Sequence, residues 1–232
     1  MTTDTGTTST PANPPSGADP RVRFARAVDL AGGVIAAVEP GRLDDPTPCD
    51  ALDVRSLLGH LVQVLDRVAA IGHDGDPSAV APLQPVADDG WLDAWRTAAH
   101  EVQAAWTDPA VLDRIVVLPW SQVSGGETLC GYLNEISVHT WDLAVATGQT
   151  VAWDDEVLAV ALSAIQRVLP AQDRAALFAA AAEAMPPQAR AFPPPFAEAV
   201  DVAPDAPVID RLVAWNGRQP RLGAGDLAGA RG

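Results

Sequence analysis

The stretch NEISVHTWDLA, residues 134–144, joins the apolar pattern of a buried helix to three polar residues on one side. Glu135, His139 and Asp142 follow the spacing i, i+4 and i+7, which aligns side chains along one stripe of an α-helix. Acidic and imidazole groups beside a core are costly unless each has a partner. The chain must therefore fold so that other residues meet this stripe. The apolar residues that place a core-facing stripe beside it are Leu129, Leu133, Ile136 and Leu143.

The composition indicates a soluble globular protein. The chain has 232 residues, 48% of them apolar, which suffices for the core of one domain or at most two. The formal net charge is −15 and every basic residue is an arginine, which argues against nucleic acid and anionic membrane surfaces as partners. No apolar run approaches the roughly 20 residues that cross a bilayer. We expect a cytoplasmic monomer or homodimer with a small-molecule substrate, in which Cys49 and Cys130 are free thiols.

Helical periodicity dominates residues 20–220 and predicts a mostly α fold, an antiparallel bundle with a short Pro-rich C-terminal extension. Residues 1–19 are rich in Thr, Pro and Gly and are predicted to be a disordered leader, and residues 221–232 a flexible tail. Asp53 is a candidate cap for the second helix, and residues 111–120 predict an extended segment or hairpin. The predicted helices cover 22–38, 54–71, 91–106, 127–148, 155–168, 173–184 and 207–215.

Glu135 and His139 lie one helical turn apart, so their side chains can converge on a single ion. Histidine and carboxylate are both zinc ligands, but two are too few and a third must come from another helix. His60 is the best placed, because it lies on the inner side of the 54–71 helix. A set of two histidines and one glutamate leaves one coordination position open for water or substrate. Asp142, one turn beyond His139, is placed to hold a ligand imidazole from behind.

Each of these residues also has a plainer interpretation. The pattern Glu-x-x-x-His is common on solvated helix faces, and His60 beside leucines would more often be a satisfied core histidine. Cys49 is a candidate fourth ligand or nucleophile, but the 11 residues before His60 correspond to about 16 Å of helical rise, which favours a capped loop thiol. Cys130 is expected to be a small core residue, and Tyr132 and Trp141 to pack rather than line a pocket. Spacing alone leaves both interpretations open.

Several segments resemble a known family. These are TPCDALDVRSLLGHLV, LPW shortly before a helix, and NEISVHTWDLAVATGQ. They resemble the DinB-like metal proteins of actinobacteria and, more closely, the N-terminal domain shared with mycothiol-dependent maleylpyruvate isomerase. The closing stretch FAEAVDVAPDAPVIDRLVAWNGRQP is similar to the tail of a subgroup known only as metal-binding. The resemblance spans roughly residues 21–220.

The resemblance implies a DinB-like antiparallel four-helix bundle that binds a divalent metal, usually zinc, through His60, Glu135 and His139. It also implies mycothiol as a thiol cosubstrate, bound as its thiolate and used for isomerisation or S-transfer. The sequence departs from the family at Ser121, where a glycine is usual, and in the expected absence of the isomerase's separate C-terminal α/β domain. Arg218 is a candidate partner for a carboxylate on a ligand.

The leading hypothesis from the sequence is a zinc-dependent mycothiol transferase or isomerase that acts on a small electrophilic metabolite. Three alternatives stay open at this point. One is a non-catalytic module that binds metal or a small molecule. Another is a zinc hydrolase with Asp142 as general base. The last is a biosynthetic enzyme that has reused the bundle pocket, with or without metal.

Overall fold

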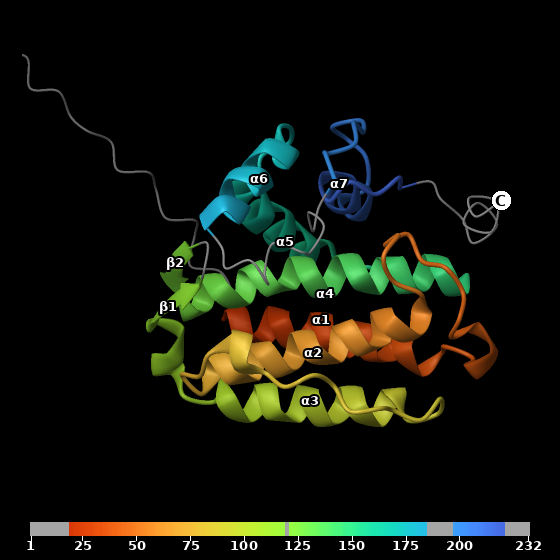
Figure 1. The fold of residues 1–232 in the computed structure, drawn as a ribbon, viewed down its shortest axis with the longest axis horizontal. Coiled ribbons are helices and arrows are strands. Elements are labelled where there is room, and N and C mark those ends of the chain that lie inside the picture. Colours follow the sequence, from red (N-terminus) through yellow and green to blue (C-terminus); the bar gives the residue numbers. More distant parts are fainter. Residues whose placement is uncertain (1–18, 119–120, 185–196, 221–232) are drawn as a thin grey trace, which may run out of the picture.

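Long helices that lie side by side form the body of the protein (Figure 1). The computed structural model describes residues 19–118, 121–184 and 197–220. Its long helices are α1 (Pro20–Ala36), α2 (Val54–Gly72), α3 (Trp91–Ala105) and α4 (Gly125–Thr147). The shorter ones that follow are α5 (Asp155–Val168), α6 (Arg174–Ala184) and α7 (Val208–Trp215). Single 3₁₀ turns are η1 (Pro40–Arg42), η2 (Pro77–Ala79) and η3 (Pro109–Leu112).

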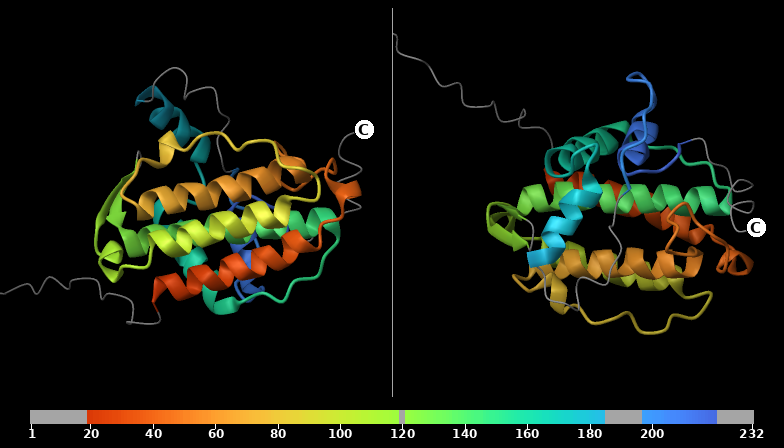
Figure 2. Two further views of the ribbon diagram at one scale, coloured as in Figure 1. Left: turned by 90° about the horizontal axis from the view of Figure 1, so that it is seen from below. Right: turned by 45° about the horizontal axis from the view of Figure 1, so that its top comes forward.

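The arrangement places α4 at the centre. Helix α4 packs against α1 and α2 on one side and against α5 and α7 on the other, while α3 packs against α1 and α2. Figure 2 shows from two further directions that α5, α6 and α7 gather on the side of α4 away from α3. The strands β1 (Ile115–Leu118) and β2 (Ser121–Ser124) form an antiparallel hairpin directly before α4. None of the described helices is long and apolar enough to cross a membrane.

The mostly α fold predicted from the sequence is confirmed. Every predicted helix is present, with ends that differ by at most two residues. The extended segment predicted over 111–120 begins later than expected, because residues 109–112 form η3 and the strand starts at Ile115. Its partner strand β2 had not been predicted, since SQVS lacks the apolar alternation of a strand. Residues 1–18 and 221–232, predicted as leader and tail, lie outside the described residues, and Asp19 caps α1.

Local signals fix where α2 and α4 begin and end, and therefore which way their side chains point. The carboxylate of Asp53 accepts a hydrogen bond from the Ser56 amide at 2.8 Å and caps α2, as predicted. Ser124 and Glu127 form a capping box at the start of α4, with each side chain accepting from the other residue's amide. Helix α4 ends at Gly148, whose φ of +71° suits a residue without a Cβ.

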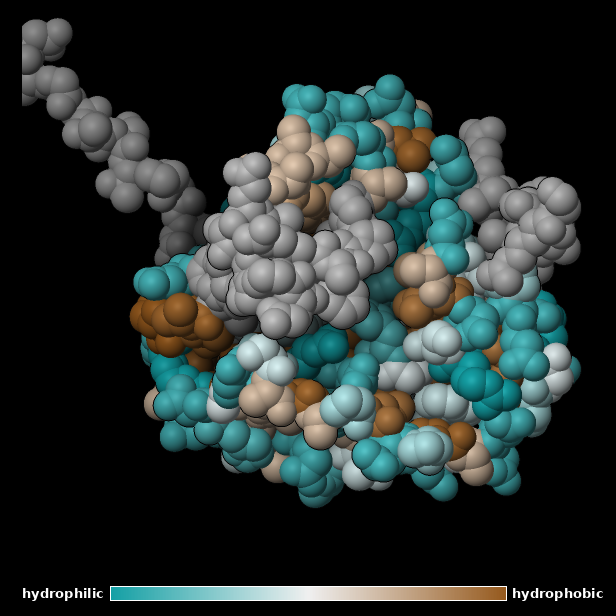
Figure 3. Space-filling view, viewed as in Figure 1, coloured by the Kyte–Doolittle hydropathy of each residue, from teal (hydrophilic) through white to brown (hydrophobic). Residues whose placement is uncertain are grey.

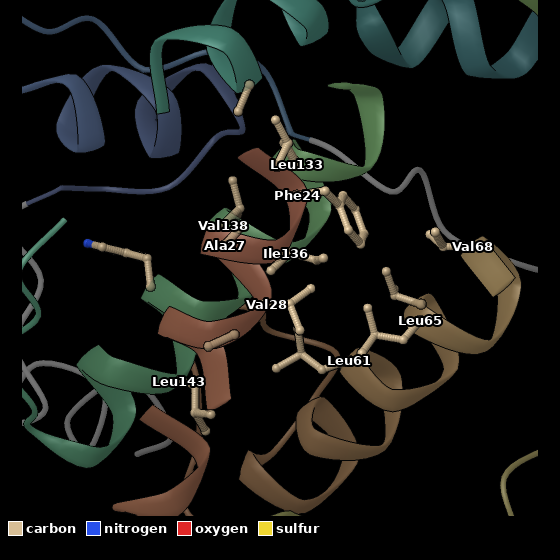
Figure 4. Packing of buried hydrophobic residues seen from close by; sticks show 14 of the residues in the cluster. Phe24, Ala27, Val28, Leu61, Leu65, Val68, Leu133, Ile136, Val138 and Leu143 are labelled. Atoms are coloured by element: carbon tan, nitrogen blue, oxygen red, sulfur yellow. The ribbon is translucent and has the colours of Figure 1, made fainter. Parts of the chain in front are cut away.

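The core lies among α1, α2 and α4. Figure 4 shows side chains from these three helices pointing into one shared interior. Full burial of an aliphatic side chain contributes roughly 1.5–3 kcal/mol, so this cluster holds the faces of α2 and α4 in register. Residues from the three helices that are buried and labelled there are Phe24, Ala27 and Val28 of α1, Leu61, Leu65 and Val68 of α2, and Leu133, Ile136, Val138 and Leu143 of α4.

The surface is mixed, with apolar side chains gathered at the hairpin. Strand β1 exposes Ile115 and Val117, at 61% and 67% of their surface. Figure 3 shows a brown patch at the end of the molecule where Figure 1 draws the two strands. The two residues are two positions apart in a strand, so they share one face of the hairpin.

Two glycines should respond in opposite ways to replacement by alanine. A Cβ at Gly72 would lie 2.7 Å from Ala105 Cβ and from Trp106 Nε1, so Gly72→Ala overpacks the contact of α2 with α3 and its end. We expect it to lower the free energy of unfolding by about 1–3 kcal/mol. A Cβ at Gly33 meets nothing within 4 Å. Gly33→Ala in α1 should therefore raise the free energy of unfolding by about 0.5–1 kcal/mol through helix propensity alone. Urea unfolding of both variants gives the signs, and equal shifts would contradict the packing described here.

Candidate metal centre

Helices α2 and α4 bring His60, Glu135 and His139 together. The Oε2 atom of Glu135 lies 3.6 Å from His60 Nε2 and 3.5 Å from His139 Nε2. One ligating atom from each of the three residues lies within 4.8 Å of the other two. The imidazole rings of His60 and His139 meet edge to face, with centroids 4.6 Å apart. The residues that the sequence singled out as a triad are thus neighbours in space; that they bind metal stays a prediction.

The donor atoms have the spacing that a tetrahedral metal site needs. Ligand bonds of about 2.0–2.2 Å in a tetrahedron place neighbouring donors about 3.3–3.6 Å apart, and the two measured separations fall in this range. Within the described part of the chain, His60 Nε2 is buried and has no hydrogen-bond partner. A buried ring nitrogen without a partner is costly. A divalent cation between the three side chains would satisfy it.

Exposure differs across the triad. The side chains of His60 and Glu135 are each 28% exposed, whereas that of His139 is 9% exposed. The triad is therefore open to solvent on the side of His60 and Glu135 and closed behind His139. An ion held by all three would have its free coordination position on the open side.

Behind His139, the ring is held by a carboxylate that is itself held by an arginine. His139 Nδ1 lies 3.0 Å from Asp142 Oδ2, and the Asp142 side chain is completely buried. Arg218 donates to the same carboxylate from two nitrogens, Nη2 to Oδ2 at 3.0 Å and Nε to Oδ1 at 3.3 Å. With Nδ1 donating to Asp142, Nε2 of His139 turns its lone pair toward Glu135 and His60.

The charges in this row shift one another's pKa values. Burial opposes ionisation of His139, but the hydrogen bonds to Asp142 and Glu135 outweigh it and raise the pKa of His139 to about 9. Burial also opposes ionisation of Glu135, yet the two histidines hold the pKa of its carboxyl far below the usual range. The same balance, with His139 and Arg218 as partners, lowers the pKa of Asp142. Without metal, the row is therefore a chain of paired charges.

A tight turn after α7 delivers Arg218 to this position. The Arg218 amide donates to the Val213 carbonyl at 2.9 Å and the Gly217 amide to Ala214 at 3.0 Å, which is the Schellman pattern of a helix end. Gly217 has a φ of +78°, and a Cβ there would lie 2.8 Å from that of Ala197. Only glycine fits this turn without strain.

A buried amide pair ties the same turn to α4. Asn216 donates to the side-chain oxygen of Asn134 at 2.8 Å and accepts from its amide at 3.1 Å. Asn216 also donates to the Leu212 carbonyl at 2.8 Å. Both asparagines are almost wholly buried, so each amide needs these partners. The C-terminal segment is thus fixed on α4 one turn before the carboxylate that Arg218 reaches.

Cys49 lies closer to the site than the sequence suggested. Its Sγ, a ring nitrogen of His139 and a carboxylate oxygen of Asp142 are all within 4.8 Å of one another. The estimate of about 16 Å assumed that helical rise continued before residue 54. The loop instead turns back at Thr47, whose hydroxyl accepts from the Cys49 amide at 3.1 Å and donates to Leu52 at 2.7 Å. Burial raises the pKa of the Cys49 thiol, although Arg218 opposes this.

The sequence predicted some of these residues better than others. The spacing along one helix identified Glu135, His139 and Asp142, and the inner face of α2 identified His60. Arg218 was a candidate for a ligand carboxylate, and in the structure its guanidinium engages Asp142 instead; whether it also reaches a ligand stays a prediction. The Asn134–Asn216 pair was missed, and its only sequence signal is an asparagine before the glycine that ends α7.

The comparisons with known proteins agree with the location of this site. Residues 11–144 match the family described as the mycothiol maleylpyruvate isomerase N-terminal domain, and the chain belongs to this family. The match includes His60, Glu135, His139 and Asp142 and ends before Arg218.

Relatives and structures add less. Two proteins of Mycobacterium tuberculosis, from strains CDC 1551 / Oshkosh and ATCC 25618 / H37Rv and both named only as uncharacterized, are each 30% identical to the chain over 207 residues. These alignments cover 88% of the chain and all of each relative, so the similarity extends well beyond residue 144. No solved structure matches.

The metal-free protein should lose stability as the pH rises from about 6.5 to about 9. The pKa of His139 is raised from 6.5 to about 9 in the folded state, so folding favours its protonated form. The resulting stabilisation, at most about 3 kcal/mol, is complete below the unfolded pKa and is lost as the pH passes through the folded one. Urea unfolding across this range, with a chelator present, measures the change. A His139→Asn variant should give a flatter profile, and a wild-type profile equally flat would contradict the charge row.

Proposed function

We propose that this protein is a divalent-metal-dependent member of its family that uses mycothiol as a thiol cosubstrate. The reaction would be an S-transfer or isomerisation of a small electrophilic metabolite in the cytoplasm, with zinc as the preferred metal. We further propose that α1–α4 form a DinB-like four-helix bundle, with α5–α7 as the C-terminal extension. The observation that carries the proposal is the set of three donor atoms at tetrahedral spacing, one of them a buried nitrogen without a partner.

Each residue has a defined part in this proposal. His60, Glu135 and His139 would hold the ion, and the open side of the triad would admit the thiol. A divalent ion bound there supplies the positive charge that keeps a thiol deprotonated at neutral pH, where a free thiol of pKa near 8.5 is only a few per cent ionised. Asp142 fixes the ring and tautomer of His139, and Arg218 balances the charge of Asp142.

The hydrolase alternative finds less support in the geometry. A general base must be able to take a proton from water near the metal. Asp142, the candidate named from the sequence, is fully buried and already accepts from His139 and twice from Arg218. Its low pKa also makes it a weak base. The alternative of a non-catalytic binding module makes a different prediction for thiols, which the next experiment measures.

The purified protein should contain about one metal ion per chain, and a Glu135→Ala/His139→Ala variant should contain almost none, because it retains one of three ligands. Elemental analysis after expression with zinc checks this. Cobalt(II) in place of zinc should then give a sulfur-to-metal charge-transfer band when mycothiol is added.

A Cys49→Ser variant is the matched control, because it removes the protein's own nearby sulfur. The band should persist in this variant. A wild-type protein with far less than one ion per chain, or metal retained by the double variant, would contradict the proposed site. A loaded site that gives no band with mycothiol would favour the non-catalytic module.

Asp142→Asn should weaken metal binding by about 10–100-fold, because the neutral amide no longer charges the ring of His139 or balances Arg218. Competition with a chromophoric chelator measures the affinity. Asp93→Asn, at an aspartate whose side chain is 87% exposed on α3, makes the same chemical change away from the site and should leave the affinity unchanged. Equal affinities for the two variants would remove Asp142 from the proposal.

A further inference from the structure

A second polar stripe runs along α2 from the triad. Gln63 and Arg67 follow His60 at i+3 and i+7, so the three side chains share one side of the helix. Figure 4 shows Leu61, Leu65 and Val68 of the same helix pointing into the core. The polar stripe therefore lies at the edge of the core, and all three of its residues are partly buried.

Helix α4 presents a matching stripe across from it. Helices α2 and α4 pack together and run in opposite directions (Figure 1). Residues that follow His60 on α2 therefore lie beside residues that precede Glu135 on α4. The residues one turn before Glu135 are Gly131 and Tyr132, which places them near Arg67. The positive charge of Arg67 acts on the Tyr132 phenol, as this placement requires.

The polar groups of this pair of stripes lack protein partners. Across residues 19–118, 121–184 and 197–220, Gln63, Arg67 and Tyr132 form no hydrogen bond or ion pair. A guanidinium has five N–H donors and is rarely left half-buried without an acceptor. The nearest anion in the sequence, Asp66, is adjacent on the helix, and adjacent residues do not face each other. Burial raises the pKa of Asp66, which further weakens it as a counter-ion.

There is also room for a ligand beside these groups. Gly131 is exposed, and a Cβ added to it would meet no atom within 4 Å. The side chains of His60 and Glu135, at the other end of the stripes, are partly open to solvent. The α2–α4 face thus offers one continuous polar surface from the triad to Arg67.

We propose that Arg67, assisted by the Tyr132 hydroxyl, binds a carboxylate on the substrate whose reactive end lies at the triad. The inference rests on the proposed function and adds a substrate class to it, namely electrophiles that carry an anionic group. The seven residues from His60 to Arg67 rise about 10 Å along the helix. The ligand is therefore elongated, with its anionic group about two helical turns from its reacting end.

A matched pair of thiols tests the proposal on cobalt-loaded protein. The probes are 6-mercaptohexanoate and 6-mercaptohexanol, which share a sulfur and a six-carbon chain and differ in the terminal charge. Titration of the charge-transfer band gives a dissociation constant for each. Wild-type protein should bind the carboxylate about tenfold more tightly, as expected for one charge-assisted contact. Arg67→Gln should abolish this preference without changing the affinity for the alcohol or the metal.

Two further variants make the result specific to Arg67. Arg67→Lys should keep part of the preference, because it retains the charge without the planar fork. Arg96→Gln removes an arginine whose side chain is 68% exposed on α3, and should keep all of it. Tyr132→Phe should reduce the preference by a few-fold. Equal affinities of wild-type protein for the two thiols, or a preference that survives Arg67→Gln, overturn the proposal.

Failure of the proposed function would look different. If neither thiol produces the band, the thiol chemistry is wrong, and suberate then tests the anionic subsite by calorimetry on the metal-loaded protein. Binding of suberate that Arg67→Gln weakens supports the subsite. Absent binding, or binding that the variant leaves unchanged, overturns it.

Discussion

The buried carboxylate of Asp142 is the constraint on which the rest of the site depends. A charged group with no exposed surface costs several kcal/mol unless its partners replace water, and here three hydrogen bonds do so. Arg218 provides two of them and His139 the third. Because Asp142 needs both, the orientation of the candidate ligand His139 and the position of the C-terminal turn are set by the same interaction. Removal of either partner would leave a buried charge on α4.

This coupling makes the segment after α6 part of the site. The family match ends at residue 144, yet the guanidinium that balances Asp142 belongs to residue 218. The segment is held by directional contacts: the Schellman turn at Gly217, the amide pair of Asn134 and Asn216, and the packing of α7 on α4 and α5. The segment therefore works as a structural clamp on α4, and the family domain alone lacks the cation that its buried carboxylate requires.

The parts of the protein that local interactions decide were predictable from the sequence. Caps such as Asp53 and stops such as Gly148 mark helix ends, and spacing within α4 places Glu135, His139 and Asp142 on one stripe. Tertiary geometry decides the rest. The return of the loop at Thr47, which brings Cys49 near His139, depends on a side-chain hydrogen bond that spacing cannot show. The partner of Arg218 could not be assigned either, because a separation of 76 residues carries no periodicity.

The alternation of charge from Arg218 through Asp142, His139 and Glu135 toward His60 has a consequence for the order of events in the life of the chain. In a zinc finger, the ligands repel or stay unpaired until the ion arrives, so folding waits for loading. Here protons already neutralise the acids, and a cation would enter by displacing them. The scaffold can therefore be complete before any ion arrives, and occupancy becomes a matter of supply and acidity rather than of assembly.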